Sequence, residues 1–171
     1  LKRLLELKNN STQRAECEIR KSLYAEKEQI QKIFCDGRKF SGTVGIYMSK
    51  GDTHRGGRSV AKVELDNGTI LYYKPHSLDK NIKYQELYNY LCRKTGISCR
   101  TVQYLSHDSY GWEEKIENIP CKNESEVEHY YFRMGIHLFL GYALGATDLH
   151  GENIIAHGEY PVIIDMETYP G

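Results

Sequence analysis

The sequence predicts an α+β fold, with an antiparallel sheet over residues 41–116, the 82–94 helix against it, and helical structure after it. The dipeptide Asn67-Gly68 separates two short runs of β-branched and aromatic residues, which is the strongest short-range signal for a β-hairpin. The segment 125–145 opens with a capping box, Ser125-Glu-Val-Glu128, and closes on Gly145, as helices commonly do. These two features define the expected order of strands and helices.

The first element expected is a helix. Residues 12–36 are polar and carry Leu23, Ile30 and Ile33 at helical spacing, which predicts one amphipathic helix. Its simplest role is to pack on the neighbouring sheet without taking part in any chemistry.

Three strands should follow. Residues 42–48 are rich in β-branched and aromatic side chains, and the two arms of the hairpin cover 60–65 and 69–74. Pro75 cannot donate a ladder hydrogen bond and should close the third strand. Because side chains alternate along a strand, Lys74 shares one face of that strand with Ile70 and Tyr72.

The next stretch predicts a helix and two strand-like pieces. Residues 82–94 have the helical spacing, and Gly96 suits the C-terminal end. The apolar face would consist of Tyr84, Leu87, Tyr88 and Leu91. Strand-like pieces cover 101–105 and 112–116, and Trp112 is more often a core residue than a ligand-stacking one.

The helix at 125–145 carries many apolar residues. Its expected buried stripe consists of Val127, Tyr130, Tyr131, Met134, Leu138, Tyr142 and Leu144. His129 and His137 lie on it and are expected to be ordinary surface or core histidines. The chain then divides into a helical N-terminal segment (1–40), a sheet-containing part (41–116) and a final part (117–171).

The final part contains the most informative pattern. Asp148 is followed five positions later by Asn153, then by two short apolar segments joined through a turn, and then by Asp165. This is the layout of a kinase catalytic loop and its metal-binding Asp. One carboxylate meets the substrate hydroxyl, while an amide oxygen and a second carboxylate hold Mg²⁺ against the phosphates of ATP.

Upstream residues agree with a phosphoryl-transfer site. A polar loop with three glycines, 50–58, joins the first two strands, and Lys74 ends the third. Glu86 on the 82–94 helix could pair with Lys74, as a helix glutamate does in kinases, or could be solvated. Taken alone, Lys74 is most often a solvated strand-end lysine. The ordered set of loop, lysine, helix and catalytic loop favours phosphoryl transfer.

Three segments carry a resemblance to a known family. They are Gly51-Asp-Thr-His-Arg-Gly-Gly-Arg-Ser-Val60, Tyr73-Lys-Pro-His-Ser-Leu78 and the run from Thr147 to Thr168. Together they resemble the dehydratase domain of class II lanthipeptide (type 2 lantibiotic) synthetases, over roughly residues 40–171. The last segment is long enough to be highly specific.

The resemblance implies a fold and an activity. In such synthetases the N-terminal domain resembles a lipid kinase, phosphorylates Ser and Thr of a precursor peptide with ATP and Mg²⁺, and eliminates phosphate to leave dehydroamino acids. It therefore implies a kinase-like N-lobe, an antiparallel sheet with a helix, followed by the start of a helical C-lobe containing the catalytic loop. It also implies a leader-bearing precursor peptide as partner, and a C-terminal cyclase domain in the full-length parent.

The resemblance also assigns roles to residues of the kinase layout. Lys74 would contact the ATP phosphates, Asp148 would be the catalytic-loop Asp, and Asn153 and Asp165 would bind the metal. His150 would lie near the transferred phosphate.

Two residues of the glycine-bearing loop, Asp52 and His54, match family positions tied to the active site. Whether they serve phosphorylation, elimination or both is open. His76 stands where the family usually has Arg, so a cationic contact there is in question. The chain lacks an initiator Met and stops at Gly171, before the family's elimination residues, so we expect an excised fragment that cannot complete dehydration alone.

The amino-acid composition bears on the partners and the cellular compartment to expect. The 23 basic and 23 acidic residues balance, which gives no indication of nucleic acid or a membrane surface as partner. The five cysteines are odd in number and never form C-x-x-C, which favours free thiols in a reducing cytoplasm. No apolar run approaches the roughly 20 residues of a membrane span.

Two rival functions remain open at this stage. One is a different kinase-like phosphotransferase that acts on a small molecule or a lipid, since the catalytic pattern fits it equally. The other is a non-catalytic peptide-binding module. The presence of Lys74, Asp148, Asn153 and Asp165 together argues against the second.

Overall fold

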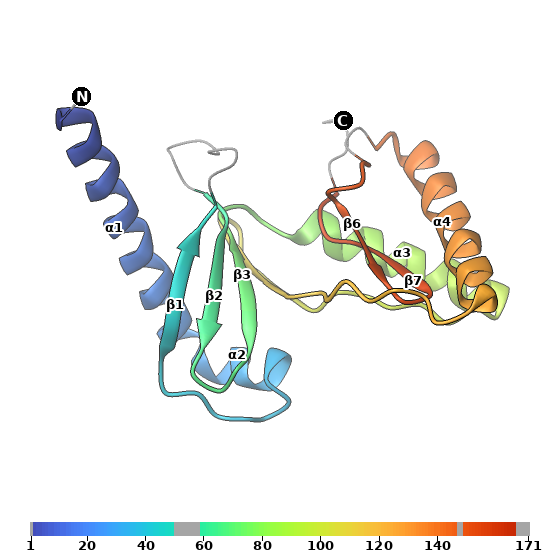
Figure 1. Ribbon diagram of the computed structural model, residues 1–171, viewed down its shortest axis with the longest axis horizontal. Coiled ribbons are helices and arrows are strands. Elements are labelled where there is room, and N and C mark those ends of the chain that lie inside the picture. The colour runs from blue at the N-terminus through green and yellow to red at the C-terminus, as the bar shows by residue number, and fades with distance from the viewer. Residues whose placement is uncertain (1, 50–58, 147–148, 167–171) are drawn as a thin grey trace. The chain divides into compact units, whose positions relative to one another are not determined.

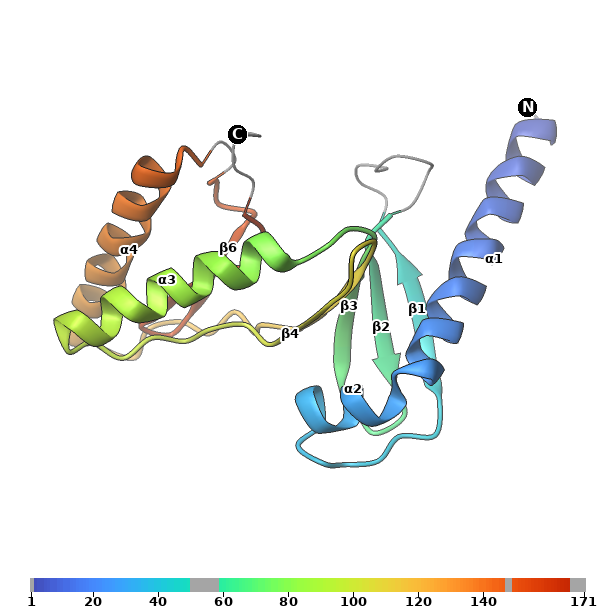
Figure 2. The same cartoon turned by 180° about the vertical axis from the view of Figure 1, so that it is seen from behind.

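The computed structural model describes residues 2–49, 59–146 and 149–166, with side chains from residue 12 onward. Its elements are α1 (Lys2–Ala25), α2 (Lys27–Phe34), β1 (Thr43–Met48), β2 (Ala61–Leu65), β3 (Ile70–Lys74), α3 (Asp79–Thr95), β4 (Tyr104–Ser106), β5 (Gly111–Glu114), α4 (Glu124–Leu144), β6 (Ile154–His157) and β7 (Tyr160–Ile163) (Figures 1 and 2). They fall into two compact units, Leu1–Leu78 with Gln103–Lys115, and Asp79–Val102 with Ile116–Gly171.

A five-stranded antiparallel sheet forms the centre of the first unit. Its strand order is β1-β2-β3-β5-β4. The hairpin predicted at Asn67-Gly68 is confirmed, and Gly68 has φ +85°, a conformation that side chains disfavour. The Asn67 side chain closes the turn by accepting a hydrogen bond of 3.0 Å from the Thr69 amide. The strand-like pieces predicted at 101–105 and 112–116 are present as the shorter β4 and β5.

One face of this sheet packs against α1 and α2. Because side chains alternate along a strand, Val63, Leu71 and Trp112 lie on the same face. The buried cluster consists of Ile19, Leu23, Ile30, Cys35, Phe40, Ala61, Val63, Leu65, Leu71, Tyr73 and Trp112. Trp112 is fully buried, as the sequence predicted, and the Tyr73 ring meets it edge-on at 5.3 Å.

The single helix predicted over 12–36 is two helices. α1 begins earlier than predicted, and the chain leaves helical geometry at Glu26 before α2 begins. The Glu26 carboxylate accepts a hydrogen bond of 2.9 Å from the indole N–H of Trp112, which ties the break to β5. The periodicity hides this break because Leu23 and Ile30, on either side of it, are both buried in the same cluster.

The second unit consists of α3, α4 and the β6–β7 hairpin. Its buried cluster joins these elements through Tyr84, Tyr88, Cys92, Leu140, Ile163 and Met166. The buried side chains of α3 pack with α4 and β7. Because α3 and the five-stranded sheet belong to different units, the expected packing of the 82–94 helix against the sheet stays a prediction. Leu87 is exposed, whereas Gly96 ends the helix as predicted, with φ +72°.

The N-terminal cap of α4 differs from the predicted one. The Asn123 side chain accepts a hydrogen bond of 2.9 Å from the Glu126 amide, and the Glu126 carboxylate accepts one of 2.8 Å from the Lys122 amide. This reciprocal pair stands two residues upstream of the box predicted at Ser125. Gly145 ends the helix in the left-handed conformation, as predicted.

The buried face predicted for α4 is wrong. Tyr131, Leu138 and Tyr142 from the predicted stripe are 69%, 61% and 91% exposed, while the polar residues Arg133 and His137 are buried. Apolar residues surround this helix on most sides, so spacing could not select one face. Within the described residues, no helix has the length and apolar character needed to cross a membrane.

Candidate functional site

The β6–β7 hairpin brings two predicted metal ligands to the same end. Ile154 pairs with Ile163, and the pairing continues one step further, because the Ile164 amide donates a 3.0 Å hydrogen bond to the carbonyl oxygen of Asn153. Asp165 follows directly. Both predicted ligands are half-buried. The hairpin therefore brings the backbone of Asn153 beside the residue that precedes Asp165.

A tight turn leads into this end of the hairpin. The Asn153 amide donates to the carbonyl oxygen of His150 at 3.0 Å, and the Glu152 amide donates to Nδ1 of the His150 ring at 3.2 Å. A ring nitrogen that accepts a hydrogen bond carries no proton, so the neutral ring has its proton on Nε2. His150 itself is exposed.

Helix α3 supports the same end of the hairpin through Asn81. Its side-chain amide donates to the carbonyl oxygen of Ile164 at 3.3 Å, and Asn81 is only 4% exposed. This bond fixes the backbone at the residue before Asp165. No sequence signal marks Asn81, because an Asn in the first turn of a helix is common and its spacing matches no motif.

A buried histidine joins α3, α4 and β7. Nε2 of His137 lies 3.0 Å from the carbonyl oxygen of Pro161, which can only accept, so Nε2 carries the proton and Tyr84 O–H donates to Nδ1 at 2.6 Å. The Tyr88 ring stacks on the imidazole. Burial lowers the pKa of His137 to about 4, and the hydrogen bond to Pro161 offsets only part of this effect. The predicted ordinary core histidine is confirmed.

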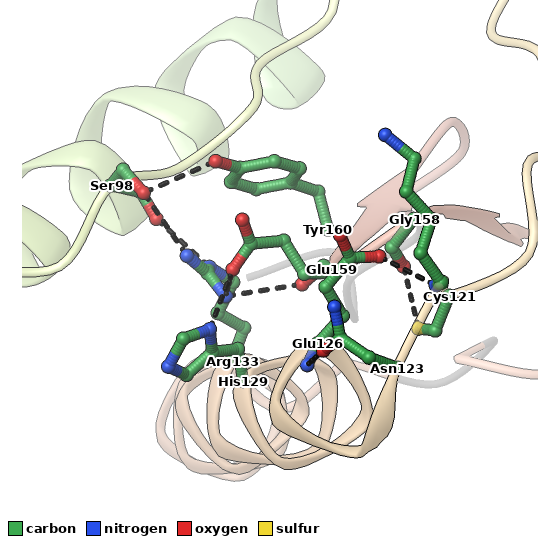
Figure 3. A network of polar contacts seen from close by, with 10 residues as sticks. Ser98, Cys121, Asn123, Glu126, His129, Arg133, Gly158, Glu159 and Tyr160 are labelled. Atoms are coloured by element: carbon green, nitrogen blue, oxygen red, sulfur yellow. Dashed lines mark hydrogen bonds and ion pairs between the residues drawn. The ribbon is translucent and has the colours of Figure 1, made fainter.

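Arg133 of α4 holds the turn end of the hairpin (Figure 3). Its Nη1 donates to the Glu159 carboxylate at 2.9 Å and to the Glu159 carbonyl at 3.2 Å. Its Nε and Nη2 donate to the carbonyl and hydroxyl oxygens of Ser98, at 2.9 Å and 3.0 Å. The guanidinium also lies over the Tyr160 ring. Since Arg133 is only 4% exposed, these contacts satisfy a cation removed from water.

Glu159 is the anionic centre of this network. Nδ1 of His129 lies 2.8 Å from the carboxylate oxygen that also binds Arg133. Burial raises the pKa of the Glu159 carboxyl, but the hydrogen bonds and charges of Arg133 and His129 outweigh it and hold the pKa below its usual range. The turn of the hairpin is thus tied to α4 by an ionised carboxylate.

The segment before α4 holds the other side of the hairpin. The Ile119 amide donates to the carbonyl oxygen of Ala156 at 2.9 Å, and the Gly158 amide donates to the carbonyl oxygen of Ile119 at 2.7 Å. The Cys121 thiol also contacts the Gly158 carbonyl, as Figure 3 shows. The hairpin that carries Asn153 and Asp165 is therefore anchored along its length.

Lys74 is buried in the first unit. It ends β3 with 5% exposure, and its Nζ lies 3.0 Å from Oε2 of Glu113 on β5. The register pairs Tyr72 with Glu113 and Lys74 with Gly111, so the two charged residues are diagonal neighbours on one face. A solvated strand-end lysine, the commonest interpretation of Lys74 alone, is not what the structure contains.

The structure gives less information about the other predicted site residues. Asp52, His54 and Asp148 lie outside the described residues. Glu86 is exposed on α3. Because Lys74 belongs to the first unit and Glu86 to the second, their pairing stays a prediction, as does the convergence of both units on one nucleotide.

The donor set at the end of the hairpin fits a magnesium ion. Asn153 offers an amide oxygen and Asp165 a carboxylate, and Mg²⁺ binds few protein oxygens while water and phosphate complete its shell. Within 2–49, 59–146 and 149–166, no group of three or more His, Cys, Asp or Glu could hold a metal. Such a donor pair would leave coordination positions for water and a phosphate ligand.

Two hollows on the second unit lie away from these donors. One of about 530 Å³ is lined by Gly96, Ile97, Ser98, Glu128, His129, Phe132, Arg133 and Glu159. One of about 440 Å³ is lined by Leu91, Thr95, Tyr131, Phe132, Gly135, Ile136 and Phe139. Of the predicted site residues that the structure describes, Lys74, Glu86, His150, Asn153 and Asp165, none lines either hollow.

Comparison with known proteins agrees with the motifs. The chain is similar to the "Lacticin 481/lactococcin biosynthesis protein LcnDR2" of Lactococcus lactis subsp. lactis, with 35% identity over 135 residues. The match covers 74% of this chain but only 14% of the relative. It confirms the resemblance to class II lanthipeptide synthetases. A family model described as a domain of unknown function, DUF4135, matches residues 1–170, and the chain therefore belongs to the DUF4135 family.

Proposed function

We propose that this chain is part of the dehydratase domain of a class II lanthipeptide synthetase. That domain phosphorylates Ser and Thr of a precursor peptide with Mg-ATP and then eliminates phosphate to give dehydroamino acids. The observation that carries the proposal is the β6–β7 hairpin, which sets Asn153 beside the segment that leads to Asp165. The printed role of the relative, in lacticin 481 and lactococcin biosynthesis, supports a peptide as the substrate.

In this proposal the kinase-like roles fall on a small set of residues. Asp148 accepts the proton of the peptide hydroxyl while that oxygen attacks the γ-phosphorus of ATP and ADP departs. Lys74 binds the phosphates through its ammonium group, and Asn153 and Asp165 hold the metal. Bound Mg²⁺ would neutralise charge on the phosphates. His150, which is exposed, would lie near the transferred phosphoryl group.

The second step removes the α-proton of the phosphorylated residue and expels phosphate. Asp52 and His54 belong to the same active site in this proposal, and their division between the two steps is open. A C-terminal cyclase domain in the full-length parent would use the dehydroamino acids. We further propose a cytoplasmic location, which suits the five free cysteines of the chain.

The substrate class separates this proposal from its rivals. The full-length protein that carries this chain is incubated with ATP, Mg²⁺ and a leader-bearing precursor peptide, and in parallel with small alcohols and with a lipid. Mass spectrometry should detect a phosphorylated peptide and then its dehydrated product, with no phosphorylated alcohol or lipid. Phosphorylation of the alcohol or lipid alone would instead support another phosphotransferase.

A binding measurement addresses the non-catalytic alternative. Calorimetry should detect binding of Mg-ATP by the same protein, and this binding should weaken in the Lys74→Met variant. A protein that binds the precursor peptide but neither binds nor consumes Mg-ATP would be a peptide-binding module.

A further inference from the structure

The ammonium group of Lys74 and the carboxylate of Glu113 form a nearly fully buried ion pair. The two side chains are 6% and 2% exposed. Removing two charges from water is costly, and an apolar pair of similar size would stabilise the sheet equally well or better. A requirement for the charge of Lys74 therefore explains this pair better than a requirement for stability does.

The two partners differ in rigidity. Glu113 lies on an inner strand, where it pairs with Tyr72 on one side and with Tyr104 on the other. Its backbone is therefore fixed from both sides. Lys74 is the last residue of its strand, and its side chain has four flexible methylene groups. The fixed carboxylate thus determines where the flexible ammonium group lies.

The residue directly opposite Lys74 adds no polar side chain. That residue is Gly111, and a Cβ placed on it would lie 2.5 Å from Cδ1 of Leu78, which is fully buried. An aliphatic side chain therefore occupies the space beside Lys74. Within this part of the sheet, the diagonal carboxylate of Glu113 is placed to hold the ammonium group.

Glu86 occupies the position that the kinase layout assigns to the lysine's partner. It is exposed on α3. Its neighbour Gln85 is committed to the backbone, because the Gln85 side chain both donates to the carbonyl oxygen and accepts from the amide of Val102. Glu86 is therefore the rival candidate for the partner of Lys74, and an exposed glutamate without a proposed role, Glu28 of α2, is the control.

We infer that Glu113 is the positioning residue that holds the ammonium group of Lys74 where ATP phosphates meet it. The inference rests on the proposed function and moves the partner role from a helix to strand β5. Without the carboxylate, the buried ammonium group loses its compensating charge. The ammonium group is then no longer held in its place, and ATP binds more weakly.

The test compares Glu113→Gln, Glu113→Asp, Lys74→Met, the rival Glu86→Gln and the control Glu28→Gln in the full-length protein. Initial rates of peptide phosphorylation are measured over a range of ATP concentrations, and thermal unfolding is recorded for each variant. Glu113→Gln should raise the KM for ATP about tenfold to a hundredfold, the effect of losing a charge-assisted hydrogen bond. Glu113→Asp should recover part of this loss, and the exposed control Glu28→Gln should change the KM less than about twofold.

A purely structural role of Glu113 predicts a different pattern. Destabilisation lowers the amount of active protein and the apparent kcat but leaves the KM for ATP unchanged. If Glu113→Gln does not fold, the KM for ATP of Glu113→Asp distinguishes the two roles, because this variant keeps the charge and shifts only its position. An unchanged KM for ATP in the folded variants would overturn the inference.

The remaining outcomes separate this inference from the proposed function. If Lys74→Met abolishes phosphorylation while the Glu113 variants keep a parental KM for ATP, the inference fails and the function stands. If Lys74→Met itself retains parental kinetics, the proposed role of Lys74 fails. If Glu86→Gln raises the KM for ATP as predicted for Glu113→Gln, the partner has been assigned to the wrong residue.

Discussion

The carbonyl oxygen of Asn153 accepts a hydrogen bond of 3.0 Å from the amide of Ile164, which holds Asn153 beside the residue that precedes Asp165. A two-stranded hairpin thus sets the separation of the two predicted metal ligands by backbone pairing. Polar side chains of α3 and α4 fix this hairpin from both helices. The predictions below test that arrangement and the chemistry proposed for it.

Acid should destabilise the second unit through His137. Burial lowers its pKa from 6.5 to about 4, despite the hydrogen bond to Pro161. Between these values the unfolded chain binds a proton that the folded chain does not, so stability falls as the pH falls through this window. We expect the free energy of unfolding to drop by on the order of 3 kcal/mol across it. Denaturant unfolding at a series of pH values measures the effect.

The control for this prediction is a side chain that does not titrate. His137→Gln should flatten the pH dependence between about pH 6.5 and 4. His150→Gln changes an exposed ring and should leave the wild-type slope in place. Equal slopes in all three proteins would show that His137 titrates normally in the fold.

Arg133→Lys should loosen the hairpin even though it keeps the charge. A lysine cannot span Ser98 and Glu159 simultaneously as the guanidinium fork does. We expect a loss of about 2 kcal/mol in unfolding free energy and faster hydrogen exchange at the β6–β7 amides. Arg93→Lys, on the exposed side of α3, should change stability by less than about 0.5 kcal/mol. Equal stability of the two variants would contradict an anchoring role for Arg133.

Two glycines should respond oppositely to alanine. A Cβ on Gly135, within α4, meets nothing within 4 Å, so Gly135→Ala should stabilise by up to about 1 kcal/mol. At Gly111, a Cβ would lie 2.5 Å from Cδ1 of Leu78 and 3.1 Å from the carbonyl oxygen of Leu105. Gly111→Ala should therefore cost about 1–3 kcal/mol. Thermal unfolding measures both changes, and a gain at Gly111 would contradict the close packing.

The parts of the fold that could be predicted depend on neighbours in sequence. Gly68 in the turn has a positive φ that most residues disfavour, and alternation along β2 and β3 needs no distant partner. The buried face of α4 could not be predicted, because apolar residues surround the helix. Arg133 and His137 are on that face because Ser98 and Pro161 present carbonyl oxygens to them from other elements.

In the candidate site, too, local features could be predicted from the sequence and tertiary contacts could not. Asn153 and Asp165 are joined by a short hairpin, so their proximity follows from local spacing. The ion-pair partner of Lys74 did not follow, because Glu113 becomes its neighbour only through the register of β3 and β5. Asn81 likewise acts through a tertiary contact that no motif records.

Asp148→Ala should separate the two proposed steps. The loss of its carboxylate removes the acceptor for the peptide hydroxyl proton, so phosphorylation should fall strongly. Elimination from a chemically prephosphorylated peptide should continue, because that step does not begin from a hydroxyl. Mass spectrometry of both peptides measures the two rates, and an equal loss of both steps would assign Asp148 to a shared role.

Phosphopeptide formation by Asp165→Asn is the most direct test of the central claim that the hairpin holds the metal for phosphoryl transfer. The substitution keeps the size of the side chain and removes one metal-binding charge. With ATP, Mg²⁺ and the precursor peptide, the full-length variant should form phosphopeptide at least about a hundredfold more slowly than the parent, with thermal unfolding unchanged. Asp108→Asn, at an exposed position, should retain the parental rate. A parental rate in Asp165→Asn would contradict the account.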